Sequence, residues 1–206
     1  MKTWRLGAFG GTFDPIHSGH LIAAASVRNA LELDFVFFIP TGNSWHKLPG
    51  PLAPAMDRLA MVDLAIADYE GFMSSSVDID RHGPTYTIDT LTDLQAQWHG
   101  ENREDEATWF FITGADALAD FPNWKEPEEI LQRAQMVGVT RPGFTATPGP
   151  LLTGHSIVIE AATPDIASSD IRLRVREGRS IEGLLPTVIA DYIQTHALYR
   201  ETPVGL

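Results

Sequence analysis

Residues 4–20 of the chain read WRLGAFGGTFDPIHSGH, and this stretch indicates how the chain folds. The apolar run from Trp4 to Phe9 predicts a buried strand that stops at Gly10-Gly11. The apolar residues from His17 to Leu31 then recur at helical spacing, so a helix follows the strand directly. A strand that passes through a glycine turn into a helix is the first half of a β-α-β unit.

The rest of the chain repeats this alternation of short apolar runs and longer amphipathic stretches. The predicted strands span residues 35–39, 76–80, 108–113, 136–140 and 156–160, and the predicted helices span residues 56–69, 87–98, 169–177 and 186–196. Strands that alternate with helices along a whole chain predict an α/β fold, a doubly wound parallel sheet with crossover helices between the strands.

The length of 206 residues favours one domain over two. We expect a single domain over residues 1–206, with a C-terminal helical part, from about residue 166 to 200, packed on it. Two loops, residues 41–54 and 142–154, are rich in Gly, Pro and Thr. Long loops in compact domains tend to be functional or mobile, so both are candidates for contact with a ligand.

The composition excludes several classes of function. Lys and Arg number 15 against 27 Asp and Glu, which leaves a formal charge of −12 and argues against broad binding to DNA or RNA. A small anionic ligand remains compatible with this charge because it needs only a few local cations. The chain has no cysteine, so disulfides, thiol catalysis and zinc–thiolate sites are excluded.

The sequence also argues against a membrane location. No apolar stretch approaches the roughly 20 residues that a membrane span requires. The N-terminal residues Met1–Arg5 lead into an apolar run that is too short for a signal peptide and has no cleavage site. We therefore expect a cytoplasmic protein that has neither a membrane nor a nucleic acid as its partner.

The block Gly10–His20 holds the densest group of chemically active residues in the chain. It lies where the first strand gives way to the first helix, and ligands of open α/β sheets bind beyond such strand ends. Glycines let backbone N–H groups approach a phosphate, and the helix N-terminus adds partial positive charge. His17 and His20 can both turn toward that place, with Gly19 removing bulk between them. Imidazoles can hydrogen-bond phosphate oxygens and, if protonated, add positive charge where negative charge accumulates in phosphoryl or nucleotidyl transfer.

Each feature of this block also has a purely structural interpretation. A Gly-Gly pair is usually only a turn, and a single histidine is usually a satisfied polar residue. Asp14 could simply cap the helix. The histidine pair could bind a metal, but no matching carboxylate motif lies beside it. Taken together, two spaced histidines at a strand–helix junction favour a phosphate site over these alternatives.

A second block, Ile166–Arg172, opens a helix near the C-terminal end of the chain. Ser168, Ser169 and Asp170 are residue types that cap helices, so N–H groups and hydroxyls converge there. Arg172 lies in the first helical turn, where the helix dipole disfavours a cation unless an anion pairs with it. A bound triphosphate would supply that anion, whereas the structural alternative is a capped helix with a solvated arginine.

These blocks resemble those of a known family. Gly10–His20 resembles the GTFDPxHxGH signature of nucleotidyltransferases of the HxGH superfamily, and more narrowly that of bacterial nicotinate-mononucleotide adenylyltransferases. Ile166–Arg172 is similar to the I-S-S-T-x-I-R motif of that family, with Ala167 in place of the first Ser and Ser169 in place of Thr. Further matches are Pro40-Thr41-Gly42, His46-Lys47, Pro84–Thr87, Thr90-Leu91, Gly114–Asp116, Trp124, Arg141–Gly143 and segments between residues 185 and 199.

The resemblance implies a Rossmann-like nucleotidyltransferase fold and adenylyl transfer from ATP to nicotinate mononucleotide. The products would be nicotinate adenine dinucleotide and pyrophosphate, in the biosynthesis of NAD. The resemblance assigns catalysis to His17, His20 and Arg172. It assigns ATP binding to the same three residues and to Gly10, Gly11, Thr12, Phe13, Gly114, Ser168 and Ser169. Mg²⁺ would arrive on the ATP phosphates, without a metal site made by the protein.

For the mononucleotide, the resemblance points to Lys47, Tyr86, Thr87, Asp116, Trp124 and Arg141. Lys47 could reach a phosphate as a mobile point charge, and Arg141 stands at a strand end, in the crevice. Asp116 could accept hydrogen bonds from ribose hydroxyls. Trp124 could stack on the pyridine ring. The backbone N–H groups around Tyr86 and Thr87, at a helix start, could receive the pyridine carboxylate.

Two other functions remain open from the sequence. One is another HxGH adenylyltransferase, with nicotinamide mononucleotide or pantetheine phosphate as its acceptor. The other is a nucleotide sensor without turnover, against which the intact His17, His20, Lys47 and Arg172 argue. A metal-dependent hydrolase is a distant third because ligands for a metal are lacking. The oligomeric state stays open and includes a homo-oligomer.

Overall fold

A six-stranded sheet forms the centre of the computed structural model, which describes residues 2–42, 53–101, 105–141, 143 and 149–200. Its strands lie in the order β3-β2-β1-β4-β5-β6, and each neighbouring pair is parallel. The strands are β1 (Thr3–Gly11), β2 (Phe35–Pro40), β3 (Phe72–Ser74), β4 (Glu106–Gly114), β5 (Gln135–Thr140) and β6 (Ser156–Glu160). From β1 the chain adds strands toward one edge of the sheet, up to β3, and then toward the other edge, from β4 to β6. This is the Rossmann order, and it confirms the predicted fold class.

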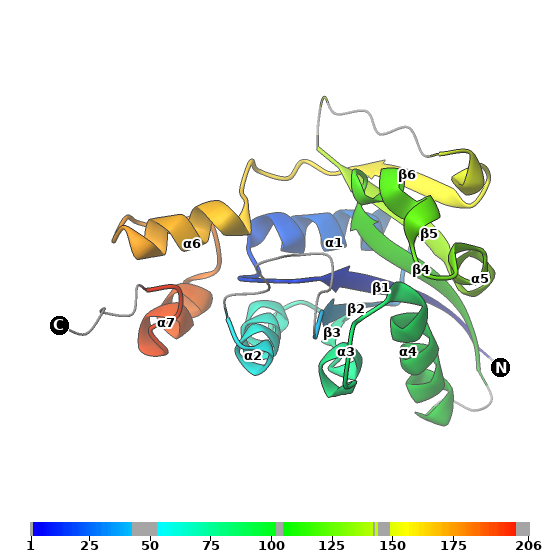
Figure 1. Cartoon of the computed structure of the whole chain (residues 1–206), viewed down its shortest axis with the longest axis horizontal. Helices are drawn as coiled ribbons and strands as arrows, with labels where there is room; N and C mark the ends of the chain where they lie inside the picture. Colours follow the sequence, from blue (N-terminus) through cyan, green and yellow to red (C-terminus); the bar gives the residue numbers. More distant parts are fainter. Residues whose placement is uncertain (1, 43–52, 102–104, 142, 144–148, 201–206) are drawn as a thin grey trace.

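Helices cover both faces of the sheet (Figure 1). The helices are α1 (Ser18–Ala30), α2 (Ala55–Ile66), α3 (Val77–Asp80), α4 (Thr87–Glu101), α5 (Pro127–Arg133), α6 (Ser168–Arg176) and α7 (Thr187–Thr195), with the 3-10 turns η1 (Ala117–Asn123) and η2 (Pro150–Leu152). One apolar cluster joins the sheet to α1, α2, α6 and α7. The other joins it to α4, α5 and η1. None of the helices in the described ranges is long and apolar enough to cross a membrane.

Neighbouring side chains along a strand belong to different clusters. Phe38 packs with the first cluster and its neighbour Phe37 with the second. Phe110 and Phe111 divide in the same way. Successive side chains of a strand point to opposite faces, so a strand buried on both faces must be apolar at every position. The uninterrupted apolar runs in the sequence follow from this geometry.

The C-terminal helices lie beside α1 and α2 at the carboxyl end of β1. Ile171 of α6 and Ile189 and Ile193 of α7 are buried in the first cluster. In Figure 1, α6 and α7 lie at one end of the molecule, away from the amino terminus. They bring the end of the chain close to the turn that follows β1.

The predicted strand at residues 76–80 is wrong. The strand of this region is β3, which pairs Phe72 with Val36 of β2, and residues 77–80 form the short helix α3. The Ser76 carbonyl accepts the backbone N–H groups of Ile79 and Asp80, and the Ser76 hydroxyl donates to the Asp80 carboxylate at 2.6 Å. These local hydrogen bonds close a helical turn. The sequence patterns did not predict α5 or η1.

The end of β2 leaves no room for a side chain at Gly42. A Cβ atom built there would lie 2.2 Å from the carbonyl oxygen of Asp78, which is backbone. We expect Gly42→Ala to lower the free energy of unfolding by about 2 kcal/mol or more, because the two segments must move apart. Gly100→Ala is the control, since a Cβ there meets no atom within 4 Å. Urea unfolding of both variants measures the difference, and equal stabilities would contradict this packing.

Candidate active site

A cleft of about 590 Å³ opens at the carboxyl ends of β1, β4 and β5. It lies beyond the two central strands between which the strand order reverses, where ligands of doubly wound sheets bind. All of the residues predicted to bind ATP line this cleft: Gly10, Gly11, Thr12, Phe13, His17, His20, Gly114, Ser168, Ser169 and Arg172. The fold therefore brings the two predicted blocks to one place, although they lie far apart in the sequence.

The two histidines lie against each other at the start of α1. His17 is the N-cap residue of the helix, and its backbone N–H donates to Nδ1 of His20 at 3.2 Å. The two imidazole rings stack with their centroids 3.8 Å apart. A Cβ on Gly19 would lie 3.0 Å from the His17 ring, so the expected role of Gly19 in removing bulk is confirmed. Because Nδ1 of His20 accepts a hydrogen bond, the neutral ring has its proton on Nε2.

His17 is neutral at pH 7 in this structure. Its side chain is buried, and burial together with the charge of Arg141 lowers its pKa from 6.5 to about 4. The sequence-based idea that a protonated imidazole supplies positive charge therefore does not hold for His17 before a ligand arrives. The positive charge of the cleft comes instead from Arg141 and Arg172, which both line it.

Asp14 is buried and holds three segments together. Its Oδ1 accepts hydrogen bonds from the Ala53 backbone N–H at 3.1 Å and from the Tyr199 hydroxyl at 2.8 Å. Arg172 donates to the backbone carbonyl of Asp14 at 2.7 Å and lies 3.8 Å from its carboxylate. Asp14 does not cap α1, because His17 occupies that position. The anion expected beside Arg172 is thus present as Asp14, even without a triphosphate.

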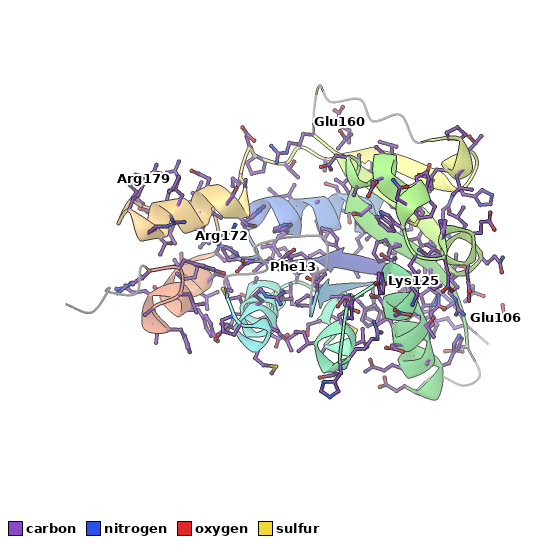
Figure 2. The ribbon with its side chains drawn as sticks, viewed as in Figure 1. Phe13, Glu106, Lys125, Glu160, Arg172 and Arg179 are labelled. Atoms are coloured by element: carbon purple, nitrogen blue, oxygen red, sulfur yellow. The ribbon has the colours of Figure 1, made fainter. Side chains whose placement is uncertain are left out.

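The start of α6 differs from the expectation for its serines. The N-cap residue is Ala167, and the first helical hydrogen bond is donated by Asp170. The Ser168 hydroxyl donates to the carbonyl of Pro15 at 3.0 Å, so it ties α6 to the first block and does not cap the helix. The N–H groups of Ser168 and Ser169 precede the first helical bond and lie in the lining of the cleft. Figure 2 shows Arg172 and Phe13 where α6 meets α1 and β1.

Sequence reasoning missed Arg58, which is almost fully buried in α2. Its guanidinium donates to the carbonyls of Thr12 at 2.7 Å and Thr41 at 2.6 Å, and also to those of Gly42 and Ala53. Burial lowers the pKa of Arg58, while the charge of Asp14 opposes that shift. Arg58 lies on the same helical stripe as Met61, Val62 and Ala65. An arginine on an apolar stripe was the signal that could have revealed it.

A second, smaller pocket of about 250 Å³ holds three of the residues predicted for the mononucleotide. Tyr86 and Thr87 line it at the start of α4, and Trp124 lines it after η1. The half-buried Trp124 ring packs edge-on against Phe111, with the centroids 6.1 Å apart. Ala117 also lines this pocket, while its neighbour Asp116 lines the larger cleft. Adjacent residues of this segment therefore line the two hollows.

Two of the three remaining residues predicted to bind the mononucleotide line the larger cleft. Asp116 and Arg141 line the larger cleft, and Arg141 forms an ion pair with Asp165. Lys47 lies outside the described residues. The structure thus separates the predicted set into a ring-sized pocket and a charged cleft. Such a division suits a ligand with an aromatic ring at one end and a phosphate at the other.

Comparisons with known proteins address the family. The model of the cytidylyltransferase-like family matches residues 8–174. A protein of Acidothermus cellulolyticus named "Probable nicotinate-nucleotide adenylyltransferase" is 47% identical over 98% of this chain and 97% of its own length. One of Streptomyces coelicolor with the same name is 44% identical, over 93% of this chain and 98% of its own. The chain belongs to the nicotinate-nucleotide adenylyltransferase family.

A solved structure from this family has the same fold. The nicotinic acid mononucleotide adenylyltransferase of Plasmodium falciparum, complexed with NaAD, matches with a TM-score of 0.75. The match covers 95% of this chain and 97% of that one, at 20% sequence identity. The likeness at that identity supports the fold, whereas membership of the family rests on the sequence relatives.

We expect Tyr199→Phe to lower the free energy of unfolding by about 1–3 kcal/mol, because it leaves the buried Asp14 carboxylate with one hydrogen bond fewer. Tyr69→Phe is the control, since the Tyr69 ring is exposed and its hydroxyl bonds to no described residue. Chemical denaturation compares the two variants with the wild type. A loss in Tyr69→Phe as large as that in Tyr199→Phe would contradict the assignment.

The lowered pKa of His17 predicts a loss of stability in acid. The unfolded chain binds a proton on this residue below pH 6.5, whereas the folded protein binds it only near pH 4. The contribution of this group to stability is thus complete above pH 6.5 and falls as the pH drops toward 4, by on the order of 3 kcal/mol. His17→Gln should unfold with a shallower dependence on pH in that window. Identical slopes for wild type and variant would refute the burial of a neutral His17.

Proposed function

We propose that the protein transfers the adenylyl group of ATP to nicotinate mononucleotide, which gives nicotinate adenine dinucleotide and pyrophosphate. The observation that supports this most is the meeting of Gly10–His20 and Ser168–Arg172 around one cleft. A smaller pocket with an aromatic wall adjoins that cleft and has room for a pyridine ring. Membership of the family, at 44–47% identity over nearly the whole chain, supports the same reaction.

ATP would lie in the larger cleft. The backbone of Gly10–Phe13 would approach its phosphates at the end of β1, where glycines leave the N–H groups accessible. His20 would donate from Nε2, the nitrogen that its bond to His17 leaves protonated. Arg172 and the N–H groups at the start of α6 would hold the β- and γ-phosphates. Because negative charge nearby raises the pKa of an imidazole, bound ATP would also favour protonation of His17.

The mononucleotide would span the two hollows. Its pyridine ring would stack on Trp124, with its carboxylate at the backbone N–H groups of Tyr86 and Thr87, where α4 begins. Asp116, between the two hollows, would accept hydrogen bonds from ribose hydroxyls. Arg141 would bind the phosphate and would have to leave its ion pair with Asp165 to do so. The contact proposed for Lys47 concerns a residue outside the described part.

The chemistry needs no base from the protein. A phosphate monoester has a second pKa near 6, so the attacking phosphate is largely a dianion at pH 7. Its oxygen attacks the α-phosphorus of ATP, and the bond to the β-phosphate oxygen breaks, which releases pyrophosphate. His17, His20 and Arg172 would stabilise the charge that accumulates on the phosphates during transfer. The protein thus contributes position and electrostatic stabilisation.

Mg²⁺ fits this site as a companion of ATP. Among the described residues, no group of three or more His, Cys, Asp or Glu side chains could hold a metal ion. The cleft instead offers arginine, imidazole and backbone N–H groups, which bind phosphate oxygens. Mg²⁺ bound to those phosphates would neutralise part of their charge. The chain would then bind the metal indirectly, through its contacts with the phosphates of ATP.

Three broader features belong to the same proposal. The whole chain would act as one nucleotidyltransferase domain, because α6 and α7 contribute both to the core and to the cleft. We place the protein in the cytoplasm, where ATP is available, with no nucleic acid among its partners because the net charge is −12. A homo-oligomer is compatible with this reaction, and sedimentation analysis would measure the oligomeric state.

Pyrophosphate release tests the reaction directly. ATP and Mg²⁺ are combined with nicotinate mononucleotide, nicotinamide mononucleotide or pantetheine phosphate as separate acceptors. We expect release with nicotinate mononucleotide at the highest kcat/KM. A strong preference for the amide would overturn the assignment of the acceptor. No release with any acceptor, together with ATP binding, would favour a nucleotide sensor over an enzyme.

His20→Ala should lower kcat by about 100- to 1000-fold, because a donor to the developing charge is lost. His99→Ala is the matched control, since His99 is exposed in the last turn of α4 and far from the cleft in the sequence and fold. Circular dichroism shows whether both variants keep the fold. An unchanged kcat in His20→Ala would remove this residue from catalysis.

A further inference from the structure

The smaller pocket has a cation that the sequence analysis did not assign. Among the described residues that line this pocket, Lys125 is the one with a positively charged side chain. Its Nζ lies 3.2 Å from each carboxylate oxygen of Asp89 and 4.8 Å from the ring centroid of Tyr86. Figure 2 shows Lys125 beside the start of α4. Two contacts therefore hold the ammonium group at one wall of the pocket.

These contacts place the ammonium group at the amino-terminal end of α4. The helix begins at Thr87 and runs for 15 residues, and Asp89 lies in its first turn. A helix of this length presents partial positive charge and unbonded N–H groups at that end. An anionic group that sits there meets both the helix end and the charge of Lys125. A neutral group of the same shape gains only hydrogen bonds.

We propose that Lys125 determines specificity by favouring a pyridine carboxylate over the corresponding amide. This inference rests on the proposed function, in which the pyridine ring of the mononucleotide stacks on Trp124 in this pocket. The carboxylate and amide forms have nearly the same shape, so packing alone separates them poorly. They differ by one negative charge, and the ammonium group of Lys125 lies where it would attract that charge.

Asp89 limits this preference. Its carboxylate neutralises part of the field of Lys125 and keeps the side chain against the helix. Asp120, also in the lining of the pocket, adds a negative charge and accepts a hydrogen bond from Asn123 at 2.7 Å. The selectivity of the pocket is thus a balance between one cation and nearby acids. Removing Lys125 or Asp89 should shift that balance in opposite directions.

The size of the effect follows from the exposure of the pair. The side chains of Lys125 and Asp89 are 40% and 31% exposed, so water and salt screen their charges substantially. Partly exposed ion pairs of this kind change an equilibrium by at most roughly fivefold. The effect should shrink as the salt concentration rises, because the Debye length falls to about 3 Å at 1 M salt.

The experiment measures kcat/KM for nicotinate and nicotinamide mononucleotides in the full chain with saturating ATP and Mg²⁺. The variants are Lys125→Gln and Asp89→Asn, with Lys2→Gln as the control, because Lys2 pairs with Asp34 at the opposite end of the sheet. Lys125→Gln should lower kcat/KM for the nicotinate form by roughly two- to fivefold, through KM, and leave the amide form unchanged. Asp89→Asn should raise the preference for the nicotinate form. Lys2→Gln should leave the ratio as in the wild type.

The outcomes separate this inference from the proposed function. If the wild type uses nicotinate mononucleotide and the ratio is unchanged in Lys125→Gln, the inference is overturned while the proposed function stands. An equal loss for both nucleotides would also overturn it, because Lys125 would then only support Tyr86 or the fold. If the wild type releases pyrophosphate with neither nucleotide, both proposals fall. The inference is supported if the ratio of kcat/KM for nicotinate to nicotinamide mononucleotide falls in Lys125→Gln and rises in Asp89→Asn. High salt should also remove the differences between these variants and the wild type.

Discussion

The buried guanidinium of Arg58 fastens the turn on which the cleft depends. The turn after β1 places two histidines at the strand end, and the carbonyls of Thr12, Asp14 and Pro15 in it accept hydrogen bonds from side chains. Arg58 supplies hydrogen bonds to the carbonyl of Thr12 in this turn, and to those of Thr41 and Ala53 in the loop that follows β2. A buried cation is costly unless it is hydrogen-bonded and near a counter-charge, and Asp14 provides the latter.

The same turn is held from its other side by the C-terminal part of the chain. Ser168 and Arg172 of α6 donate to the carbonyls of Pro15 and Asp14, and the Tyr199 hydroxyl donates to the Asp14 carboxylate. Burial and the charge of Asp14 raise the pKa of Tyr199, so the hydroxyl keeps its proton and remains a donor. The helices that follow the sheet are therefore part of the site. They contribute Ser168, Ser169 and Arg172 to the lining of the cleft and also fix the turn after β1.

Local charge, and not the net charge of −12, decides what the cleft can bind. Arg141 and Arg172 both line it. Burial lowers the pKa of His17, and the charge of Arg141 lowers it further. Each arginine also has an acid beside it, Asp165 for Arg141 and Asp14 for Arg172. The cleft therefore holds each of these two cations beside an acid of the same chain. The pair of Lys125 with Asp89 in the smaller pocket follows the same pattern.

The sequence by itself indicated the order of most strands and helices and the class of fold, because apolar periodicity and glycine turns are local signals. The residues predicted at the cleft came from the two blocks Gly10–His20 and Ile166–Arg172 and from their resemblance to a known family. It failed at residues 72–80, since the pairing of Phe72 with Val36 decides where that strand lies. Only the tertiary structure decided the parts played by Arg58, Tyr199 and Lys125. The bonds of Arg58 to Thr12 and of Tyr199 to Asp14 join residues 46 and 185 positions apart. No local propensity specifies a hydrogen-bond partner over such a distance, because folding alone brings the two groups together.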